Sequence, residues 1–215
     1  MEARIIGAAR RVFVSKGYEA TTMSDVAAEA GIGRTALHYY YRTKDIMFDA
    51  VFGQVAASIL PDIDRILDDG GTMLQKLPRI ITAYADLVRA NPDLPLFIVN
   101  EQNRAPEHMI RVISRDRERI QPLLRFMRLL EEEMERGIVR RVRKEDLILT
   151  IVSLLFFPFL VRKPLTALFM EGQAEAFGAF MDRRRDLAIE VVTRMLTPAG
   201  DCGSPHVREE GERNV

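Results

Sequence analysis

The stretch TMSDVAAEAGIGRTALHYYYRTK, residues 22–44, contains two short helical segments separated by a glycine turn. Thr22 stands three residues before Asp25, which is the spacing of a capping box, and this pair starts a helix predicted over residues 22–30. Gly31 ends that helix, because glycine takes the positive φ that a tight turn requires. The pattern therefore predicts two helices that leave the turn close together.

The second helix of this pair is predicted over residues 34–42. Ala27 is small enough to let the two helices approach, and apolar residues stand where the pair must share a core: Val26, Ile32 and Leu37. Two short helices packed in this way form the helix-turn-helix that reads DNA, although a helical hairpin without function has the same outline. The surface that the packing leaves exposed favours the first interpretation.

Successive residues turn by about 100° around a helix, so Arg34, Thr35, His38 and Tyr39 share the outward face of the second helix. Arg34 can present a bidentate fork to guanine, and the Thr35 methyl group can contact a thymine methyl. His38 and Tyr39 are predicted to bind phosphates, which fix the register on the duplex. Tyr40 lies at the margin of this face and is also predicted to bind DNA, with core packing as the alternative.

The residues beside this face divide between core and phosphate contacts. Tyr41 is expected to pack in the core. Lys44 stands in the first turn of the next helix, where a cation opposes the helix macrodipole unless an anion is bound there. A phosphate contact is therefore predicted for Lys44, with an ordinary surface lysine as the alternative. A second phosphate site is predicted at the start of the preceding helix, from Thr22 and Ser24.

The composition describes an ordinary folded protein of 215 residues, with 47% hydrophobic and 29% charged residues and a formal net charge of +0. The single Cys202 cannot form an internal disulfide, and His38, His108 and His206 are too scattered for a metal site. The N-terminal sequence does not have the pattern of a signal peptide, so a cytoplasmic location is expected. Because no catalytic motif stands out, an enzyme is not expected, and neither is a cofactor or a metal.

Proline and glycine divide the remaining sequence into helix-length pieces, and no alternating strand pattern is found. The fold is therefore predicted to be all-α. The acidic stretch after Pro61 is interpreted as a helix end and loop. The other predicted helices span residues 4–16, 43–60, 72–90, 94–104, 107–136, 144–161 and 175–196.

The sequence IIGAARRVFVSKGYEATTMSDVAAEAGIGRTALHYYYRTKDIMFDAVF, residues 5–52, resembles the DNA-binding domain of the TetR family of bacterial transcriptional regulators. The resemblance departs from the family pattern at Gly33, where a serine cap is usual, at His38, where a tyrosine is usual, and at Tyr41, where a phenylalanine is usual. The matching features are the two alanines before Val12-Phe13, Gly17-Tyr18, Thr21-Thr22, Val26-Ala27, Ala30-Gly31-Ile32, Leu37, and Lys44 followed by an acid.

The resemblance implies a domain organisation for the whole chain. Residues 1–46 would form the three-helix helix-turn-helix DNA-binding domain, and residues 47–197 a larger helical bundle that binds an effector and dimerises. The helix that Lys44 begins would link the two. Residues 198–215 are polar, rich in glycine and without periodicity, so this tail is predicted to be disordered.

The last two long helices are the candidates for a dimer interface. The run LILTIVSLLFFPFLV, residues 147–161, is almost entirely apolar, so it needs cover on every side. It is too short for a typical membrane span, which favours a core on one side and a partner subunit on the other. The predicted interface residues are Leu154, Leu155, Phe159, Ala188, Ile189, Val192 and Met195.

An effector pocket is predicted where polar groups interrupt apolar helices, although Met and Phe at helical spacing more often form the core. The expected function is a homodimeric repressor that a small, largely apolar effector releases from a palindromic DNA operator. The alternative keeps the DNA-binding domain but makes the larger domain a protein-interaction or dimerisation module. The predicted pocket residues are Tyr84, Phe97, Asn100, Glu101, Phe126, Met127, Met134 and Phe156.

Overall fold

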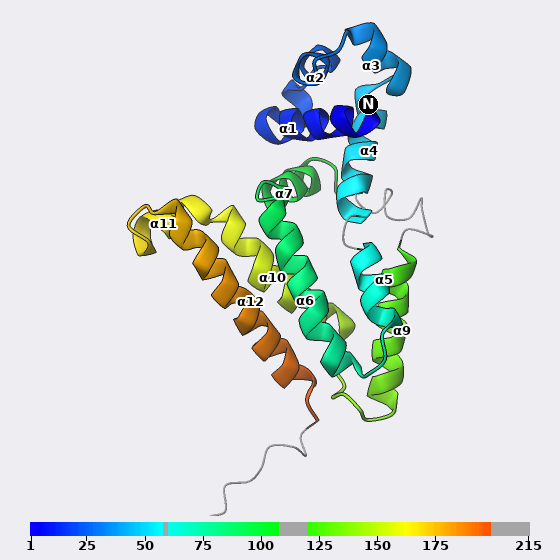
Figure 1. The fold of residues 1–215 in the computed structure, drawn as a ribbon, viewed down its shortest axis with the longest axis vertical. Helices are drawn as coiled ribbons and strands as arrows, with labels where there is room; N and C mark the ends of the chain where they lie inside the picture. Colours follow the sequence, from blue (N-terminus) through cyan, green and yellow to red (C-terminus); the bar gives the residue numbers. More distant parts are fainter. Residues whose placement is uncertain (58–59, 108–119, 199–215) are drawn as a thin grey trace, which may run out of the picture.

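The computed structural model describes residues 1–57, 60–107 and 120–198, and within these ranges the regular structure is entirely helical. The all-α prediction is therefore confirmed. Figure 1 shows an elongated molecule in which α1 to α3 form a compact head at one end, while the long helices of the body run toward the other end. The described residues of head and body form two separate hydrophobic clusters.

The head is made of four helices. They are α1 (Glu2–Ala20), α2 (Met23–Glu29), α3 (Arg34–Tyr40) and α4 (Lys44–Ala57). Its core is built on the apolar stripe of α1, on Leu37 of α3 and on the first turns of α4, and it also takes in apolar residues of α7 (Leu94–Arg104). The head core therefore includes side chains from a helix of the body, which places α7 against the head.

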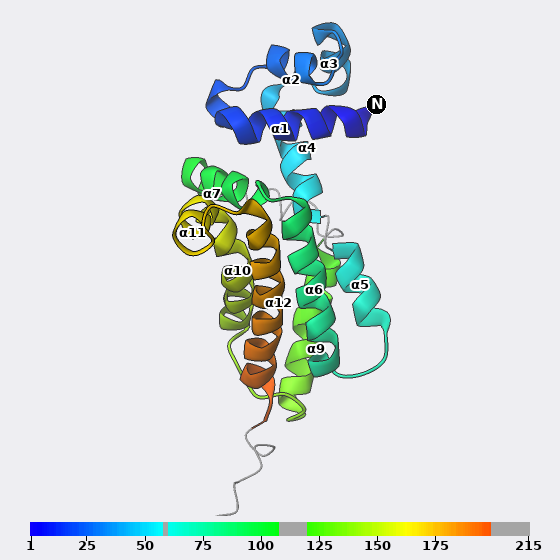
Figure 2. The same cartoon turned by 60° about the vertical axis from the view of Figure 1, so that its left-hand side comes forward.

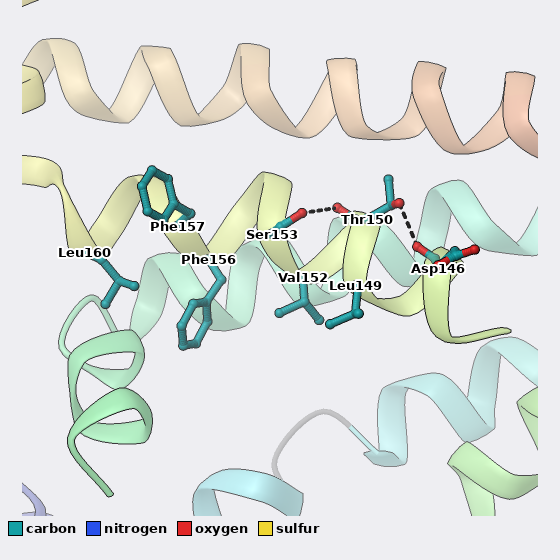
Figure 3. A pocket seen from close by; sticks show the side chains of 8 residues that line it. All are labelled: Asp146, Leu149, Thr150, Val152, Ser153, Phe156, Phe157 and Leu160. Atoms are coloured by element: carbon teal, nitrogen blue, oxygen red, sulfur yellow. Dashed lines mark hydrogen bonds between the residues drawn. The ribbon is translucent and has the colours of Figure 1, made fainter. Parts of the chain in front are cut away.

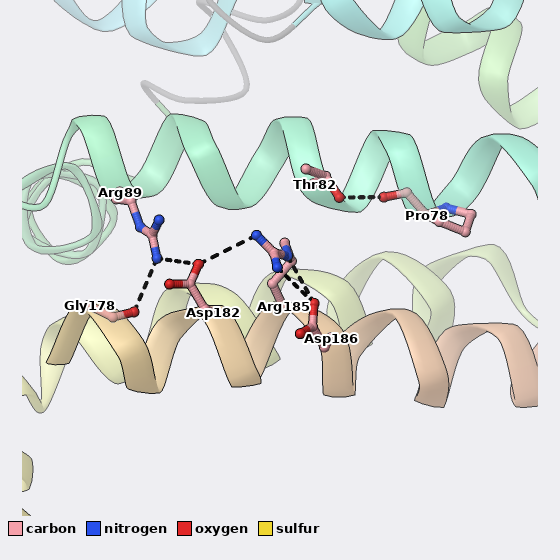
Figure 4. Close-up of polar contacts among 7 residues, drawn as sticks. All are labelled: Pro78, Thr82, Arg89, Gly178, Asp182, Arg185 and Asp186. Carbon is pink, nitrogen blue, oxygen red and sulfur yellow. Dashed lines mark hydrogen bonds and ion pairs between the residues drawn. The ribbon is translucent and has the colours of Figure 1, made fainter. Parts of the chain in front are cut away.

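The body is a bundle of longer helices in which α6 packs on α12 and α12 packs on α10. An arginine at the end of α6 helps to join two of them: Arg89 donates to the Asp182 carboxylate at 2.6 Å and to the Gly178 carbonyl at 3.1 Å (Figure 4). Besides α7, the described body helices are α5 (Leu60–Asp68), α6 (Met73–Ala90), α9 (Gln121–Glu135), α10 (Lys144–Leu160), α11 (Arg162–Phe169) and α12 (Ala174–Leu196).

Two helices are missing from the sequence prediction, and proline explains both omissions. The sequence predicts that Pro61 ends a helix, but Pro61 lies in the first turn of α5. Backbone N–H groups in the first turn make no hydrogen bond within the helix, so a proline there removes none. Pro164 lies in the first turn of α11 for the same reason. The helix predicted over 107–136 is described only from α9 onward, because residues 108–119 lie outside the described ranges.

The apolar run near residue 150 belongs to α10, which is bent by 74° from α11. In the described parts of the chain, no single helix is long and apolar enough to cross a membrane, and α10 and α11 reach that length and composition only as a bent pair. The predicted disordered tail falls almost wholly on residues 199–215, outside the described residues.

Candidate nucleic-acid interface

A capping box fixes the start of α2, as the sequence predicts. The Thr22 hydroxyl accepts from the Asp25 backbone N–H at 3.1 Å, and the Asp25 carboxylate accepts from the Thr22 N–H at 2.9 Å. Lys16 donates to the same carboxylate at 2.7 Å. The bonds from Lys16 and Thr22 lower the pKa of Asp25 to about 2. The helix macrodipole also stabilises a charged carboxylate at this N-terminus.

The turn between α2 and α3 depends on Gly31, whose φ is +63°. That conformation lets the Ile32 N–H donate to the Ala27 carbonyl at 3.0 Å, which closes the end of α2. Ala27 is 4% exposed and Leu37 is 0% exposed, so the two helices share a close-packed core. The N-cap of α3 is Gly33, which offers no side-chain bond. The helix pair is therefore held by the turn and by packing.

The outward face of α3 carries the predicted base-reading residues. Arg34 and Thr35 are exposed, and Tyr39 is 86% exposed. The Arg34 Nε lies 3.3 Å from the His38 Nε2, while the His38 Nδ1 lies 3.2 Å from the Arg42 carbonyl. Both contacts fit a neutral imidazole that donates from Nδ1 and accepts at Nε2. In this arrangement His38 orients Arg34.

The two remaining tyrosines of this stretch differ in exposure, because Tyr40 lies at the surface and Tyr41 lies in the core. Tyr40 is 40% exposed and stays beside Tyr39, with ring centroids 5.6 Å apart. Tyr41 is only 5% exposed, as expected for a core residue, and its hydroxyl donates to the Glu2 carboxylate at 3.0 Å. Burial and this bond raise the pKa of Tyr41 to about 12. The bond to Glu2 of α1 has no local sequence signal, because 39 residues separate the partners.

The predicted phosphate ligands differ in how far their side chains are already engaged. Ser24 is exposed on α2, whereas the Thr22 hydroxyl serves the capping box. The Lys44 ammonium donates to the carbonyl oxygens of Tyr18 at 2.9 Å and of Glu19 at 3.3 Å. A cation at the start of α4 therefore has an internal role that does not require a phosphate.

Two family models match this chain, one over the head and one over the body. The family model described as bacterial regulatory proteins, tetR family, matches residues 5–51. The model described as tetracyclin repressor-like, C-terminal domain, matches residues 74–192, which is more than half of the chain. The chain belongs to the TetR family. It is thus a transcriptional regulator with a DNA-binding helix-turn-helix, and not an enzyme.

The individual relatives of this chain are distant in sequence. The nucleoid occlusion factor SlmA of Photobacterium profundum is 25% identical over 122 residues, which cover 54% of this chain and 62% of that protein. The fatty acid metabolism regulator protein of Bacillus subtilis is 20% identical over 155 residues, which cover 72% of this chain and 76% of that protein. The chain spans less than two thirds of the length of the first curated relatives that it matches.

Solved TetR-family structures share the fold over almost the whole chain. A regulator from Marinobacter aquaeolei VT8 superimposes with a TM-score of 0.65 at 19% identity and covers 92% of this chain and 95% of its own. FadR from Bacillus subtilis, in complex with stearoyl-CoA, gives a TM-score of 0.64 at 17% identity and covers 88% of this chain and 98% of its own. At these identities the likeness is one of fold.

The seven predicted dimer residues lie in or against the core of the body. Leu155, Ala188 and Val192 are each 0% exposed. The other four, Leu154, Phe159, Ile189 and Met195, are half-buried and pack against the same core cluster. The predicted helices do expose apolar residues, but at other positions: Leu149, Phe157, Leu187 and Val191. The predicted interface therefore stays a prediction, and these exposed apolar residues lie on the same two helices.

The structure does not bring the eight predicted pocket residues together at one site. Tyr84, Phe126, Met127 and Met134 lie together in or against the body core. Phe97 instead packs in the head core, and Glu101 is buried in an ion pair with Arg104. Asn100 is exposed, and Phe156 lines an open groove on the outside of α10. Searched over the described residues, the chain holds no cluster of three or more metal-ligating side chains.

Proposed function

We propose that the chain is a homodimeric repressor that binds a palindromic operator and that a small, largely apolar effector releases. The exposed face of α3 carries this proposal. Arg34, Thr35 and Tyr39 project from a helix at the end of the molecule farthest from the long body helices (Figure 2). A recognition helix in this position can enter the major groove without obstruction from the rest of its own chain.

An apolar surface on the body supports the dimer. An open groove of ≈ 590 Å³ runs along α10, and its apolar lining residues are Leu149, Val152, Phe156, Phe157 and Leu160 (Figure 3). Phe157 is 56% exposed and Leu149 is 63% exposed. Exposed hydrocarbon on a helix that is apolar all round calls for a covering partner. A second copy meets that need because a two-fold axis pairs the same patch on both subunits.

A palindromic operator follows from this symmetry. One recognition helix reads only a few base pairs, whereas two helices related by a two-fold axis read half-sites about 34–36 Å apart. An effector that binds better to a dimer with another spacing must weaken operator binding, by no more than its differential affinity for the two forms.

The interior of the body supports an effector site. Tyr84 of α6 is half-buried against the body core, and its hydroxyl has no hydrogen-bond partner among the described residues. Burial raises the pKa of Tyr84. An unpaired buried hydroxyl costs about 1–3 kcal/mol, which a polar group of a bound ligand would recover. The fold shared with the stearoyl-CoA complex of FadR favours a ligand with a long apolar chain.

Selection of binding sites from a random duplex library at near-physiological salt tests the proposal. We expect a palindromic consensus from the wild type. Arg34→Ala should lose discrimination at one base pair of each half-site, at a cost of about 1–3 kcal/mol. Arg42→Ala is the matched control, because it removes an exposed charge just beyond α3 and should weaken binding equally on all sequences. No enriched motif, or equal effects of the two variants, would contradict a sequence-reading role for α3.

A further inference from the structure

Two cations from different parts of the chain contact the ring of Tyr18. The Arg104 guanidinium carbon, at the end of α7, is 3.8 Å from the ring centroid. The Lys44 ammonium, at the start of α4, is 4.3 Å from the same centroid. Phe48 packs edge-on against this ring at 5.0 Å. Cations at these distances are attracted by the face of an aromatic ring.

Further bonds fix each member of this group. Arg104 forms two bonds to the Glu101 carboxylate, at 2.8 and 2.7 Å, and the Glu101 side chain is 2% exposed. The Tyr18 hydroxyl donates to Asp45, and burial together with this bond raises the pKa of Tyr18. Because its Nε and Nη2 both donate to the Glu101 carboxylate, the planar Arg104 guanidinium has little freedom to move away from the Tyr18 ring. Tyr18 is therefore fixed from α4 and from α7 at once.

Tyr18 occupies the turn that leads from α1 into α2. It follows Gly17, which breaks the helical backbone with a φ of 74°. The Thr21 hydroxyl donates back to the Gly17 carbonyl at 2.7 Å, and the next residue, Thr22, caps α2. The position of Tyr18 thus sets where the helix-turn-helix begins.

The helix that carries Arg104 also contacts the body. α7 packs on α1 on the head side and on α10 on the body side. Phe97 of α7 lies 5.3 Å from Phe48 of α4, so the contact continues through a packed aromatic cluster. A displacement of α10 would reach the head through α7, because close-packed elements transmit shifts to their neighbours.

We propose that Arg104 is a positioning residue for DNA binding: by holding Tyr18 beside Lys44 it fixes the turn before α2 and couples α7 to the recognition unit. This inference rests on the proposed operator binding and names the residue through which the body acts on it. Arg104 itself lies behind the recognition face and acts through Tyr18.

A double-mutant cycle with Arg104→Gln and Tyr18→Leu tests the inference, with Arg79→Gln as control. Arg79 forms an exposed ion pair with Asp69, so its loss removes an arginine–carboxylate pair outside the head. The loss of the Arg104–Glu101 bonds occurs in both the wild-type and the Tyr18→Leu background, so it cancels in the cycle. Two quantities are measured well below the melting temperature: amide hydrogen exchange in residues 17–22 and affinity for the selected operator.

We expect Arg104→Gln to accelerate exchange in residues 17–22 and to weaken operator binding by about three- to tenfold, with less than the additive effect in the double variant. The control should change neither quantity. Unchanged exchange in Arg104→Gln, or strictly additive losses of affinity, would overturn the inference. If exchange accelerates but the wild type selects no operator, Arg104 still positions the turn and the proposed DNA-binding function is what fails.

Discussion

The head and the body differ in how their buried and half-buried polar groups are hydrogen-bonded. In the head, the Thr21 hydroxyl, the Tyr41 hydroxyl and the Lys44 ammonium all have partners within the chain. In the body, Lys76 is satisfied by the Leu67 carbonyl, but the Tyr84 hydroxyl has no partner in the described structure. The head is complete as a single copy, which suits a unit that must present one fixed geometry to DNA.

The recognition helix α3 and the body differ in the same way at their surfaces. The large exposed rings of α3 belong to Tyr39 and Tyr40, which carry a polar end that can hydrogen-bond. The body exposes pure hydrocarbon at Leu149, Phe157 and Leu187. The body is therefore the part of the molecule that a second copy and a ligand would complete, and each prediction below tests one side of this comparison.

The largest effect is expected in the head core. Phe48 is 2% exposed and contacts the rings of Phe13, Tyr18 and Phe97. Phe48→Ala should lower the free energy of unfolding by about 3–5 kcal/mol, because it leaves a cavity where α1, α4 and α7 meet. Urea unfolding measures this change. Phe169→Ala, at a residue that is 77% exposed, should change stability by less than about 0.5 kcal/mol. Similar losses for both would remove the distinction between core and surface.

The next effect concerns the apolar face of α10. Phe157→Glu places a charge on this face, and it should weaken self-association by about thirtyfold or more, as removal of an interface hot spot does. Sedimentation velocity over a concentration series measures the change. Leu124→Glu on α9 is the control, because Leu124 is 46% exposed and is not one of the residues that line the groove on α10. A dimer that survives Phe157→Glu would show that another surface joins the subunits.

Local signals predict the head well. The three-residue spacing of Thr22 and Asp25 fixes the start of α2, and the positive φ at Gly31 ends it. Both signals act within a few residues, so a single sequence contains them. The outward position of Arg34 and Thr35 then follows from helical geometry alone.

The body could not be predicted to the same depth. α10 is apolar on all sides, so its sequence does not show that Leu155 faces inward while Phe157 faces out. Phe97 and Glu101 have the mixed character of a pocket wall, but tertiary packing places them against the head. Arg104 gives no local signal, since its aromatic partner Tyr18 is far away in the sequence.

A smaller effect is expected at Tyr84, whose hydroxyl has no hydrogen-bond partner among the described residues. Tyr84→Phe keeps the ring and removes the hydroxyl, so stability should be unchanged or rise by up to about 1 kcal/mol. Affinity for stearoyl-CoA, measured by calorimetry, should fall by about two- to tenfold if the hydroxyl binds the ligand. Tyr40→Phe, on the head, should leave this affinity unchanged. A clear loss of stability in Tyr84→Phe would show that the hydroxyl already has a partner, and absence of binding to the wild type would exclude this ligand class.

The smallest effect is a titration on the surface of the head. The bonds from Lys16 and Thr22 lower the pKa of Asp25 from 3.8 to about 2, so they favour the charged carboxylate in the folded state. Their stabilisation is therefore complete above about pH 4 and is lost as the pH falls from there through 2. Lys16→Met should move the carboxyl titration of Asp25, followed by NMR, back toward 3.8. Arg11→Met breaks the neighbouring pair with Glu29 and should leave that titration in place. A wild-type titration midpoint near 3.8 would mean that the bonds of Asp25 to Lys16 and Thr22 are open in solution. The head would then not be fully hydrogen-bonded as a single copy, and its contrast with the body would weaken.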